Sequence, residues 1–285
     1  MTVSEFLSIS VRTLNQAGIE NPQLQAQALL SAVLGVDRAG LLLAGGEELS
    51  GSQLGEAKKL LERRVSRVPL EYLTGKVEFL GRDFSIATGV FIPRPETELL
   101  AIEAERKLEG VRSPSVLELG TGSGVVAVTL ALRCGGAIVH ANDVSRRAIE
   151  IARLNAAAHE VSDRVLLHVG DLFSALDTRR IAGRLHLLVS NPPYVCSSEI
   201  PLLAPEVSRH EPTAALDGGD DGLRYVREIL RQGPHLLAKD GWLVLEIGVN
   251  QAQEARRAAV AAGLEAVETV RDLSGIERIL VARKS

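Results

Sequence analysis

Cysteine is scarce in this chain of 285 residues, which has only two. Cys134 and Cys196 form no CxxC pair, and the six histidines are scattered without the spacing of metal ligands. We therefore expect neither a disulfide framework nor a metal at the functional site. A reduced, cytoplasmic compartment is the simplest interpretation.

Aromatic residues and positive charge are also scarce. Aromatics make up 3% of the chain, the formal net charge is -4 and the pI is about 5.9. Proteins that bind nucleic acid commonly use a basic surface, often with aromatic side chains on which bases stack. This composition disfavours nucleic acid as the main partner.

Long apolar runs are missing as well. No apolar stretch approaches the roughly 18 residues of a membrane-spanning helix, and Arg12 interrupts the N-terminal segment before a signal-like run develops. We expect no membrane partner. With 46% hydrophobic and 24% charged residues, the composition is that of a globular protein, and its length suits about two domains.

Residues 1–75 predict a small helical bundle. Thr2 and Glu5 have the spacing of a capping box at the start of the first helix. A later, longer helix is expected to carry an apolar stripe from Leu54 to Val68.

The hydrophobic period changes after this bundle. The stretch VEFLGRDFSIA alternates and turns near Gly81, which predicts a β-hairpin linker over residues 76–89. Residues 90–285 then alternate amphipathic helices with short apolar runs, namely SVLELG, AIVHAND, RVLLHVGD, LHLLVSN and GWLVLEIG. This pattern is typical of an α/β domain with a parallel sheet covered on both faces, which binds ligands at the carboxyl ends of its strands.

A glycine-rich turn follows the first of these strands. Gly120, Gly122 and Gly124 alternate in ELGTGSG, directly before the helical stretch VVAVTLALR. Such glycines allow a sharp turn and a close approach of backbone to ligand. The spacing is not that of the dinucleotide motif GxGxxG, because Val125 follows the third glycine. The turn alone leaves a nucleotide-like ligand and a purely structural turn equally open.

Acidic residues end the next two strands. Asp143 lies about 20 residues beyond the glycine turn, a spacing that suits hydrogen bonds with both hydroxyls of a ribose. Its alternative role is a helix cap, which Ser145 could equally provide. Asp171 could accept from an adenine amino group and Leu172 could cover the ring, or Asp171 could simply start a helix. A ribose and adenine without pyrophosphate suits the lack of basic residues here and suggests S-adenosylmethionine.

The stretch VSNPPY ends a fourth strand with a stiff tip. Pro192 and Pro193 have no N–H groups and cannot continue a sheet ladder. The Asn191 side-chain oxygen and the Pro192 carbonyl are two fixed acceptors for the N–H groups of an amide or aromatic amine, and Tyr194 offers a flat apolar face. Methylation of such a nitrogen needs its N–H groups held while its lone pair is freed. Asn191, Pro192 and Tyr194 are therefore the candidate catalytic residues, and they need no strong base.

Several motifs together resemble one family. The segments FIPRPETE (91–98), ELGTGSG, VSNPPY, HEPTAALDGGDDGLRY and RDLSGIERILVARK are similar to those of the HemK/PrmC protein-(glutamine-N5) methyltransferases. The resemblance covers nearly the whole chain. The NPPY tip alone is less specific, because adenine-N6 DNA methyltransferases and some ribosomal RNA methyltransferases have similar tips.

The resemblance implies a fold and a site. The fold is a Rossmann-like, seven-stranded class I methyltransferase domain with one antiparallel strand in its last strand pair, preceded by the bundle and the hairpin. With the residues singled out above, the expected cofactor site comprises Gly120, Thr121, Gly122, Ser123, Gly124, Asp143, Asp171, Leu172 and Asn191. The glutamine amide is expected to lie against Asn191, Pro192, Pro193 and Tyr194.

The resemblance also implies a reaction. A methyl group passes from S-adenosylmethionine, leaving S-adenosylhomocysteine, to the side-chain amide nitrogen (N5) of the glutamine in the GGQ motif of class 1 peptide chain release factors. Residues 1–75 are assigned to docking this protein substrate. The alternative enzyme acts on an amino group of nucleic acid, such as adenine N6 in DNA or ribosomal RNA. A third interpretation is a scaffold that only binds the cofactor.

Three further segments have two possible roles. Arg94 to Glu98 has good helix-start chemistry and is also expected to border the active site. His210–Pro212 and Asp217–Gly222 belong to a loop that is either a solvated turn or a lid. Glu246, at the end of the fifth strand, supports either the pocket or only the sheet.

Overall fold

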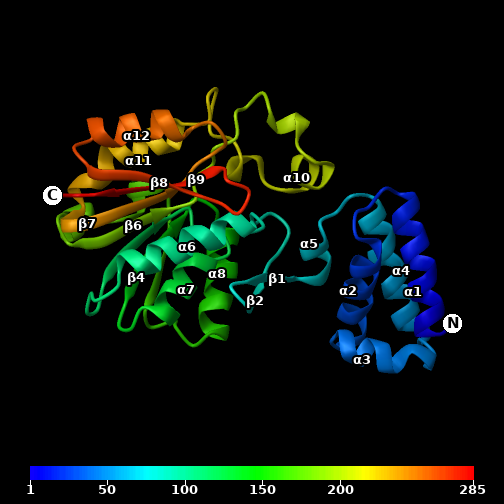
Figure 1. The fold of residues 1–285 in the computed structure, drawn as a ribbon. Coiled ribbons are helices and arrows are strands. Elements are labelled where there is room, and N and C mark those ends of the chain that lie inside the picture. Colours follow the sequence, from blue (N-terminus) through cyan, green and yellow to red (C-terminus); the bar gives the residue numbers. More distant parts are fainter. The chain divides into compact units, whose positions relative to one another are not determined.

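The computed structural model describes residues 1–285, apart from the side chain of Ala175. The chain divides into two compact units (Figure 1). Unit 1 contains residues 1–76 and 204–210, and unit 2 contains residues 77–203 and 211–285.

Unit 1 is helical. Its helices are α1 (Val3–Gln16), α2 (Pro22–Leu34), α3 (Arg38–Leu43), α4 (Gly51–Val65), α5 (Leu70–Thr74) and α10 (Pro205–His210). The capping box predicted for α1 is confirmed: the Glu5 N–H donates to the Thr2 hydroxyl over 3.2 Å, and the Thr2 N–H donates to the Glu5 carboxylate over 2.8 Å. The core of the unit is formed by buried apolar side chains that include Phe6, Leu14, Leu30, Leu41 and Leu61.

Helix α4 ends three residues before the predicted stripe does. Arg67 adopts a left-handed conformation with φ of 70°, and the Val68 N–H donates to the Arg63 carbonyl over 3.1 Å. This is the Schellman arrangement that stops a helix, so Val68 lies beyond α4. The short helices α3 and α5 were not predicted, because five or six residues carry too little periodicity to be recognised.

Membrane-spanning potential is weak in the described part of the chain. No single helix there is long and apolar enough to cross a bilayer; Pro22–Leu34 and Arg38–Gly46 pass the length and composition test only as a pair bent by 93°.

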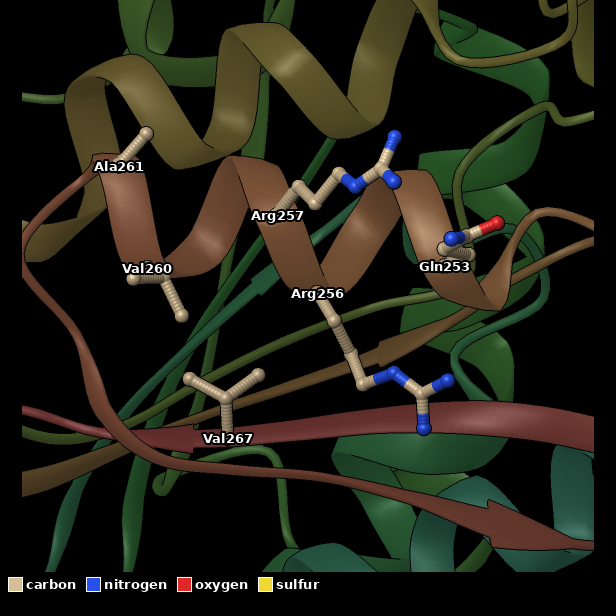
Figure 2. A pocket seen from close by; sticks show the side chains of 6 residues that line it. All are labelled: Gln253, Arg256, Arg257, Val260, Ala261 and Val267. Carbon is tan, nitrogen blue, oxygen red and sulfur yellow. The ribbon is translucent and has the colours of Figure 1, made fainter.

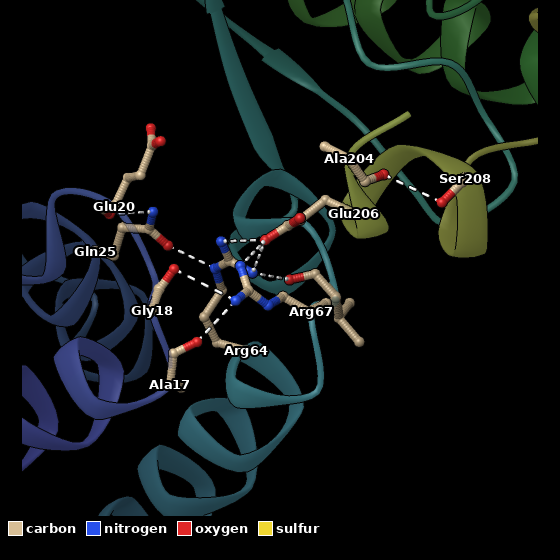
Figure 3. A network of polar contacts seen from close by, with 10 residues as sticks. Ala17, Gly18, Glu20, Gln25, Arg64, Arg67, Ala204, Glu206 and Ser208 are labelled. Carbon is tan, nitrogen blue, oxygen red and sulfur yellow. Dashed lines mark hydrogen bonds and ion pairs between the residues drawn. The ribbon is translucent and has the colours of Figure 1, made fainter. Parts of the chain in front are cut away.

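A polar network closes unit 1 around Arg64, whose side chain is only 6% exposed (Figure 3). Arg64 donates to the Gln25 side chain over 2.5 Å and to the Glu206 carboxylate over 3.0 and 3.1 Å. Arg67 donates to the same Glu206 oxygen over 3.3 Å. Since Glu206 belongs to α10, residues 204–210 are held to the helices of residues 1–76 by a shared carboxylate.

The predicted hairpin is confirmed as β1 (Lys76–Phe79) and β2 (Arg82–Ser85), with Gly81 in a left-handed conformation at the turn. All of it except Lys76 belongs to unit 2. Asn155 ties the hairpin to the rest of the unit. Its side-chain oxygen accepts from the Ser85 N–H over 2.7 Å, and its side-chain nitrogen donates to the Ser85 carbonyl over 2.9 Å.

A seven-stranded sheet forms the centre of unit 2, in the order β5-β4-β3-β6-β7-β9-β8. Strands β3 to β7 are parallel, and β9 pairs antiparallel with both β7 and β8. This confirms the predicted fold class and the antiparallel strand. The strands are β3 (Ser115–Leu119), β4 (Ile138–Asp143), β5 (Val165–Val169), β6 (Leu185–Ser190), β7 (Leu237–Glu246), β8 (Glu265–Arg271) and β9 (Glu277–Arg283).

Helices cover both faces of this sheet, as Figure 1 shows. One apolar cluster joins the sheet to α6 (Pro95–Lys107), α7 (Val125–Arg133) and α8 (Arg146–Ala158). A second cluster joins the other face to α11 (Arg224–Gln232) and α12 (Ala252–Ala261). The short α9 (Thr178–Ile181) lies between β5 and β6 in sequence.

The strand register aligns the carboxyl ends of the central strands. Leu119 of β3 pairs with Asn142 of β4 and with Ser190 of β6, and Ser190 pairs in turn with Leu245 of β7. The residues that follow these positions therefore emerge side by side at one edge of the sheet, which is where a parallel sheet binds its ligands.

Candidate active site

The turn between β3 and α7 needs glycine because of its backbone conformation and, at Gly124, because of a close neighbour. Gly120, Gly122 and Gly124 all have positive φ, at 70°, 57° and 81°. A Cβ on Gly124 would lie 2.9 Å from the Cβ of Ala152, so α8 packs directly on the turn there. A Cβ on Gly122 would meet nothing within 4 Å, and one on Gly120 would lie 3.9 Å from the Asn191 carbonyl. The turn is thus closed toward α8 and open on its other side, beside the NPPY tip.

Buried polar groups hold this turn in shape. The Thr121 N–H donates to the Asn142 carbonyl over 2.9 Å, and the Thr121 hydroxyl donates to the Glu118 carboxylate over 2.6 Å. Burial raises the pKa of Glu118 to about 8, against the opposing effect of the Thr121 hydrogen bond. The Ser123 hydroxyl is buried and has no partner among the described residues, whereas the Ser123 carbonyl accepts from Asn155 over 2.8 Å.

Asp143 joins the glycine turn to the end of β4. One carboxylate oxygen accepts from the Gly122 N–H over 2.9 Å, and the other accepts from the Ser145 N–H over 2.8 Å. Burial raises the pKa of Asp143, while these two hydrogen bonds lower it. The cap of α8 is Ser145, whose hydroxyl accepts from the Ala148 N–H over 3.2 Å. Helix capping therefore does not explain Asp143, and each of its oxygens keeps capacity for a further donor.

The end of β5 places Asp171 and Leu172 in an unusual turn. Asp171 is exposed and starts the 3₁₀ helix Leu172–Ala175, but its side chain makes no capping hydrogen bond. Leu172 has a φ of 43°, a conformation that costs energy for a residue other than glycine. Asn142 holds it there by donating to the Leu172 carbonyl over 2.6 Å and to the Gly170 carbonyl over 3.0 Å. No role was predicted for Asn142 from sequence, although it precedes Asp143 at a strand end.

The NPPY tip follows β6 and is part of a four-residue hydrogen-bond network. The Asn191 amide nitrogen donates to the Thr97 hydroxyl over 3.0 Å. Thr97 donates in turn to one oxygen of Glu246 over 2.9 Å, and the Tyr194 hydroxyl donates to the other oxygen over 3.1 Å. A single carboxylate at the end of β7 therefore holds both polar side chains of the tip, one directly and one through Thr97 of α6.

Glu246 is fully buried, which has electrostatic consequences. Burial raises its pKa to about 7; the hydrogen bonds from Thr97 and Tyr194 lower it, Glu96 raises it and Arg278 lowers it. Burial and the neighbouring Glu246 also raise the pKa of the Tyr194 hydroxyl, so Tyr194 stays protonated and acts as a donor. Of the two roles left open for Glu246, these contacts favour support of the site.

The tip leaves two acceptors free. Among the described residues, nothing donates to the Asn191 side-chain oxygen or to the Pro192 carbonyl. Pro192 is buried, while Asn191, Pro193 and Tyr194 are partly exposed. These groups can therefore meet a ligand that brings N–H donors.

The loop after α10 packs on the backbone of the tip. Val195 exchanges backbone hydrogen bonds with this loop, accepting from the Gly218 N–H over 2.8 Å and donating to the Leu216 carbonyl over 2.9 Å. A Cβ on Gly218 would lie 2.8 Å from the Pro193 carbonyl oxygen, so only glycine fits. We call residues 216–222 the backing loop.

The end of the backing loop is equally close. A Cβ on Gly222 would lie 2.2 Å from the Tyr194 carbonyl oxygen and 2.3 Å from the side-chain nitrogen of Gln251. Gln251 itself donates to the Tyr194 carbonyl over 2.9 Å. The loop was predicted to be either a solvated turn or a lid. Gly218 and Gly222 contact the tip, so the solvated turn is wrong for these two residues. Gln251 was missed, because no local signal marks it.

The FIPRPETE segment is fixed by a buried carboxylate. Glu211, from the HEP stretch, accepts from the Ile92 N–H over 3.2 Å and forms an ion pair with Arg94. Farther along, Glu98 accepts from the Leu80 N–H over 2.7 Å. These contacts fix the first turn of α6, and Thr97 from that turn reaches Asn191. The segment therefore borders the tip as well as starting a helix.

A separate surface hollow of about 500 Å³ lies on α12 and β8 (Figure 2). Its lining residues are Gln253, Arg256, Arg257, Val260, Ala261 and Val267. None of them is among the candidate site residues. Arg256 is already engaged by Thr269 and Glu277, at 3.1 and 3.2 Å.

Comparisons with known proteins give the family of this chain. Residues 5–75 match the family model of the PrmC N-terminal domain, and residues 95–205 match that of the methyltransferase small domain. A methyltransferase structure from Pyrococcus furiosus has a TM-score of 0.53 and 17% identity, covers 72% of this chain and 90% of its own, and shows the fold alone.

Curated relatives match along almost the whole chain. The release factor glutamine methyltransferase of Geobacter sulfurreducens is 38% identical over 99% of this chain and 96% of its own length. That of Chlorobaculum tepidum is 37% identical over 97% of this chain and 95% of its own. With this identity over nearly full lengths, the chain belongs to the release factor glutamine methyltransferase family.

Proposed function

We propose that this enzyme methylates the side-chain amide nitrogen of the GGQ glutamine in class 1 peptide chain release factors, in the cytoplasm, with S-adenosylmethionine as methyl donor. The observation that carries the proposal is the pair of unpaired acceptors on the tip, the Asn191 side-chain oxygen and the Pro192 carbonyl. A primary amide brings two N–H donors to match them. The names of the relatives supply the substrate class.

The residues at the strand ends fit the methyl donor. When bound, S-adenosylmethionine supplies an electrophilic methyl group on a sulfonium and leaves as S-adenosylhomocysteine. Asp143 would accept from the ribose hydroxyls with the capacity left on its two oxygens. Asp171 would accept from the adenine amino group, and Leu172 would lie on the ring. The open side of the turn from Gly120 to Gly124 leaves room for a ligand to approach the backbone.

The tip would prepare the amide nitrogen for attack. Its lone pair is delocalised into the carbonyl, so the nitrogen is a weak nucleophile. Asn191 and Pro192 would each hold one N–H and so turn the nitrogen toward the methyl group, while Pro193 and Tyr194 pack against the planar amide. The same two acceptors stabilise the positive charge that develops on the N–H groups, and one proton then passes to solvent. No general base is needed.

Residues 1–75, of which 5–75 match the PrmC N-terminal domain, are proposed to dock the protein substrate. Hydrogen exchange of the full chain tests this assignment. Addition of a release factor should slow amide exchange on the surface of α1 to α5. Unchanged exchange there, in a mixture that still supports methyl transfer, would contradict the docking role.

Methyl transfer from labelled S-adenosylmethionine to two substrates in parallel tests the reaction. One substrate is a purified release factor, and the other is unmodified DNA or ribosomal RNA. Label in the release factor that disappears with Asn191→Ala is the expected result. Label only in nucleic acid would support the adenine-N6 alternative, and no transfer to either with the cofactor still bound would support a scaffold.

A further inference from the structure

The Thr97 hydroxyl lies between two partners of the active-site network. It is within hydrogen-bond distance of the Asn191 amide at 3.0 Å and of the Glu246 carboxylate at 2.9 Å. A hydroxyl has one proton to donate, and an ionised carboxylate can only accept. Thr97 must therefore donate to Glu246 and accept from its other neighbour. The neighbour that can donate is the NH₂ group of Asn191.

We propose that Thr97 and Glu246 are positioning residues that fix the orientation of the Asn191 amide, with its nitrogen on Thr97 and its oxygen toward the substrate. This inference rests on the proposed function, since it assigns a direction to the acceptor that holds the glutamine amide. Neither residue contacts the reacting atoms. Each acts through Asn191.

The orientation matters because a side-chain amide has two nearly isosteric ends. With the amide reversed, the Asn191 NH₂ would face the N–H groups of the substrate, and two donors would meet without an acceptor between them. The fixed β6–β7 register keeps Glu246 next to the tip, since Ser190 pairs with Leu245. The second oxygen of Glu246 is occupied by the Tyr194 hydroxyl at 3.1 Å, so the carboxylate is held from both sides.

Protonation of Glu246 would remove the preference for this orientation of the Asn191 amide. A protonated carboxyl can donate to Thr97, which can then donate to the Asn191 oxygen and favour the reversed amide. The charged or titratable groups that face Glu246 are Glu96 of α6, Tyr194 of the tip and Arg278 of β9, and Arg278 is also paired with Asp272 at 3.2 Å. Because the pKa of Glu246 is raised to about 7, the ionised form predominates above that pH. Turnover should therefore increase as the pH rises through about 7.

Substitutions at Thr97 test the proposal directly. Thr97→Val keeps the shape and removes the hydroxyl, whereas Thr97→Ser keeps the hydroxyl. Thr129→Val is the matched control, because Thr129 is also buried in a helix but its hydroxyl has no partner among the described residues. We expect Thr97→Val to lower kcat for release-factor methylation by about 10- to 100-fold, with KM for the release factor little changed. Thr97→Ser should restore most of the activity, and Thr129→Val should match the wild type.

The pH profile of Glu246→Gln distinguishes a positioning role from a purely structural one. The wild type should gain activity as Glu246 ionises, whereas the Gln variant should be slower and flat across that pH range. This profile also decides the question if Thr97→Val fails to fold. Equal kcat for Thr97→Val and Thr129→Val, or the same pH profile for Glu246→Gln and wild type, would overturn the positioning role while leaving the proposed function intact. A wild type that leaves the glutamine unmethylated would overturn both.

Discussion

Gly222→Ala should disable the tip without touching a proposed catalytic side chain. The new Cβ would lie 2.2 Å from the Tyr194 carbonyl oxygen, where an ordinary contact begins at 3.4 Å, so tip and loop must separate by about 1.2 Å. The same Cβ would lie 2.3 Å from the Gln251 nitrogen that donates to that carbonyl. A displacement of about 1 Å can cost about 100-fold in rate, so we expect kcat to fall by about that factor.

The stability cost has two parts that a matched control separates. Gly222 has a φ of 72°, which penalises any residue with a Cβ by about 1 to 2 kcal/mol, and the overlap adds about 1 to 3 kcal/mol. Gly263 has a φ of 78° with nothing within 4 Å of its Cβ position, so Gly263→Ala pays only the first part. Urea unfolding measures the difference between the variants.

Methyl transfer to a release factor and calorimetry with S-adenosylmethionine complete the test. Gly222→Ala should lose turnover but keep its cofactor affinity within about threefold, because the Tyr194 carbonyl is not part of the proposed cofactor site. Equal turnover for Gly222→Ala and Gly263→Ala would show that the backing loop does not hold the tip in place.

Three further predictions concern affinity and stability. Asp143→Asn should weaken S-adenosylmethionine binding by about 10- to 100-fold in calorimetry, and unchanged affinity would remove the ribose role. Gly124→Ala should lower the unfolding free energy by about 2 to 4 kcal/mol in urea, because of its φ of 81° and the 2.9 Å approach of α8; wild-type stability would contradict that packing. Glu206→Gln should lower the free energy of unfolding by about 1 to 3 kcal/mol, because it leaves the buried Arg64 without a charged partner. The control Glu150→Gln removes one side of an exposed ion pair and should change that free energy by no more than about 0.5 kcal/mol. Equal effects of the two variants would show that the Arg64 network contributes little to stability.

Local patterns were enough to predict most of the fold. Each central strand is a short apolar run with Gly, Asn or Asp at its last position or within two residues beyond it, as at Asn142 and Asp143. The hairpin carries a strict alternation around Gly81. The end of α4 was misplaced because Arg67, a residue with no special preference for a left-handed conformation, provides the stop. That choice is made by the tertiary contacts of unit 1 and not by the residue type.

In the candidate site, too, only residues with a local signal in the sequence could be predicted. Asn191 and its neighbours could be named from sequence, because two prolines after a strand are a local signal with a chemical meaning. Thr97, Gln251 and the contacts of Glu246 with the tip could not be predicted. They lie 94, 60 and 55 positions from Asn191 and are brought to it only by the sheet register and by the packing of α6 and α12. Non-local contacts of this kind leave no pattern in a single sequence.

Peptide mass spectrometry of a release factor after reaction with this enzyme and S-adenosylmethionine is the decisive test of the proposed reaction. We expect one added methyl group, located on the side-chain amide of the GGQ glutamine and absent when Asn191→Ala replaces the wild type. A methyl group on any other residue, or one that persists with Asn191→Ala, would contradict it.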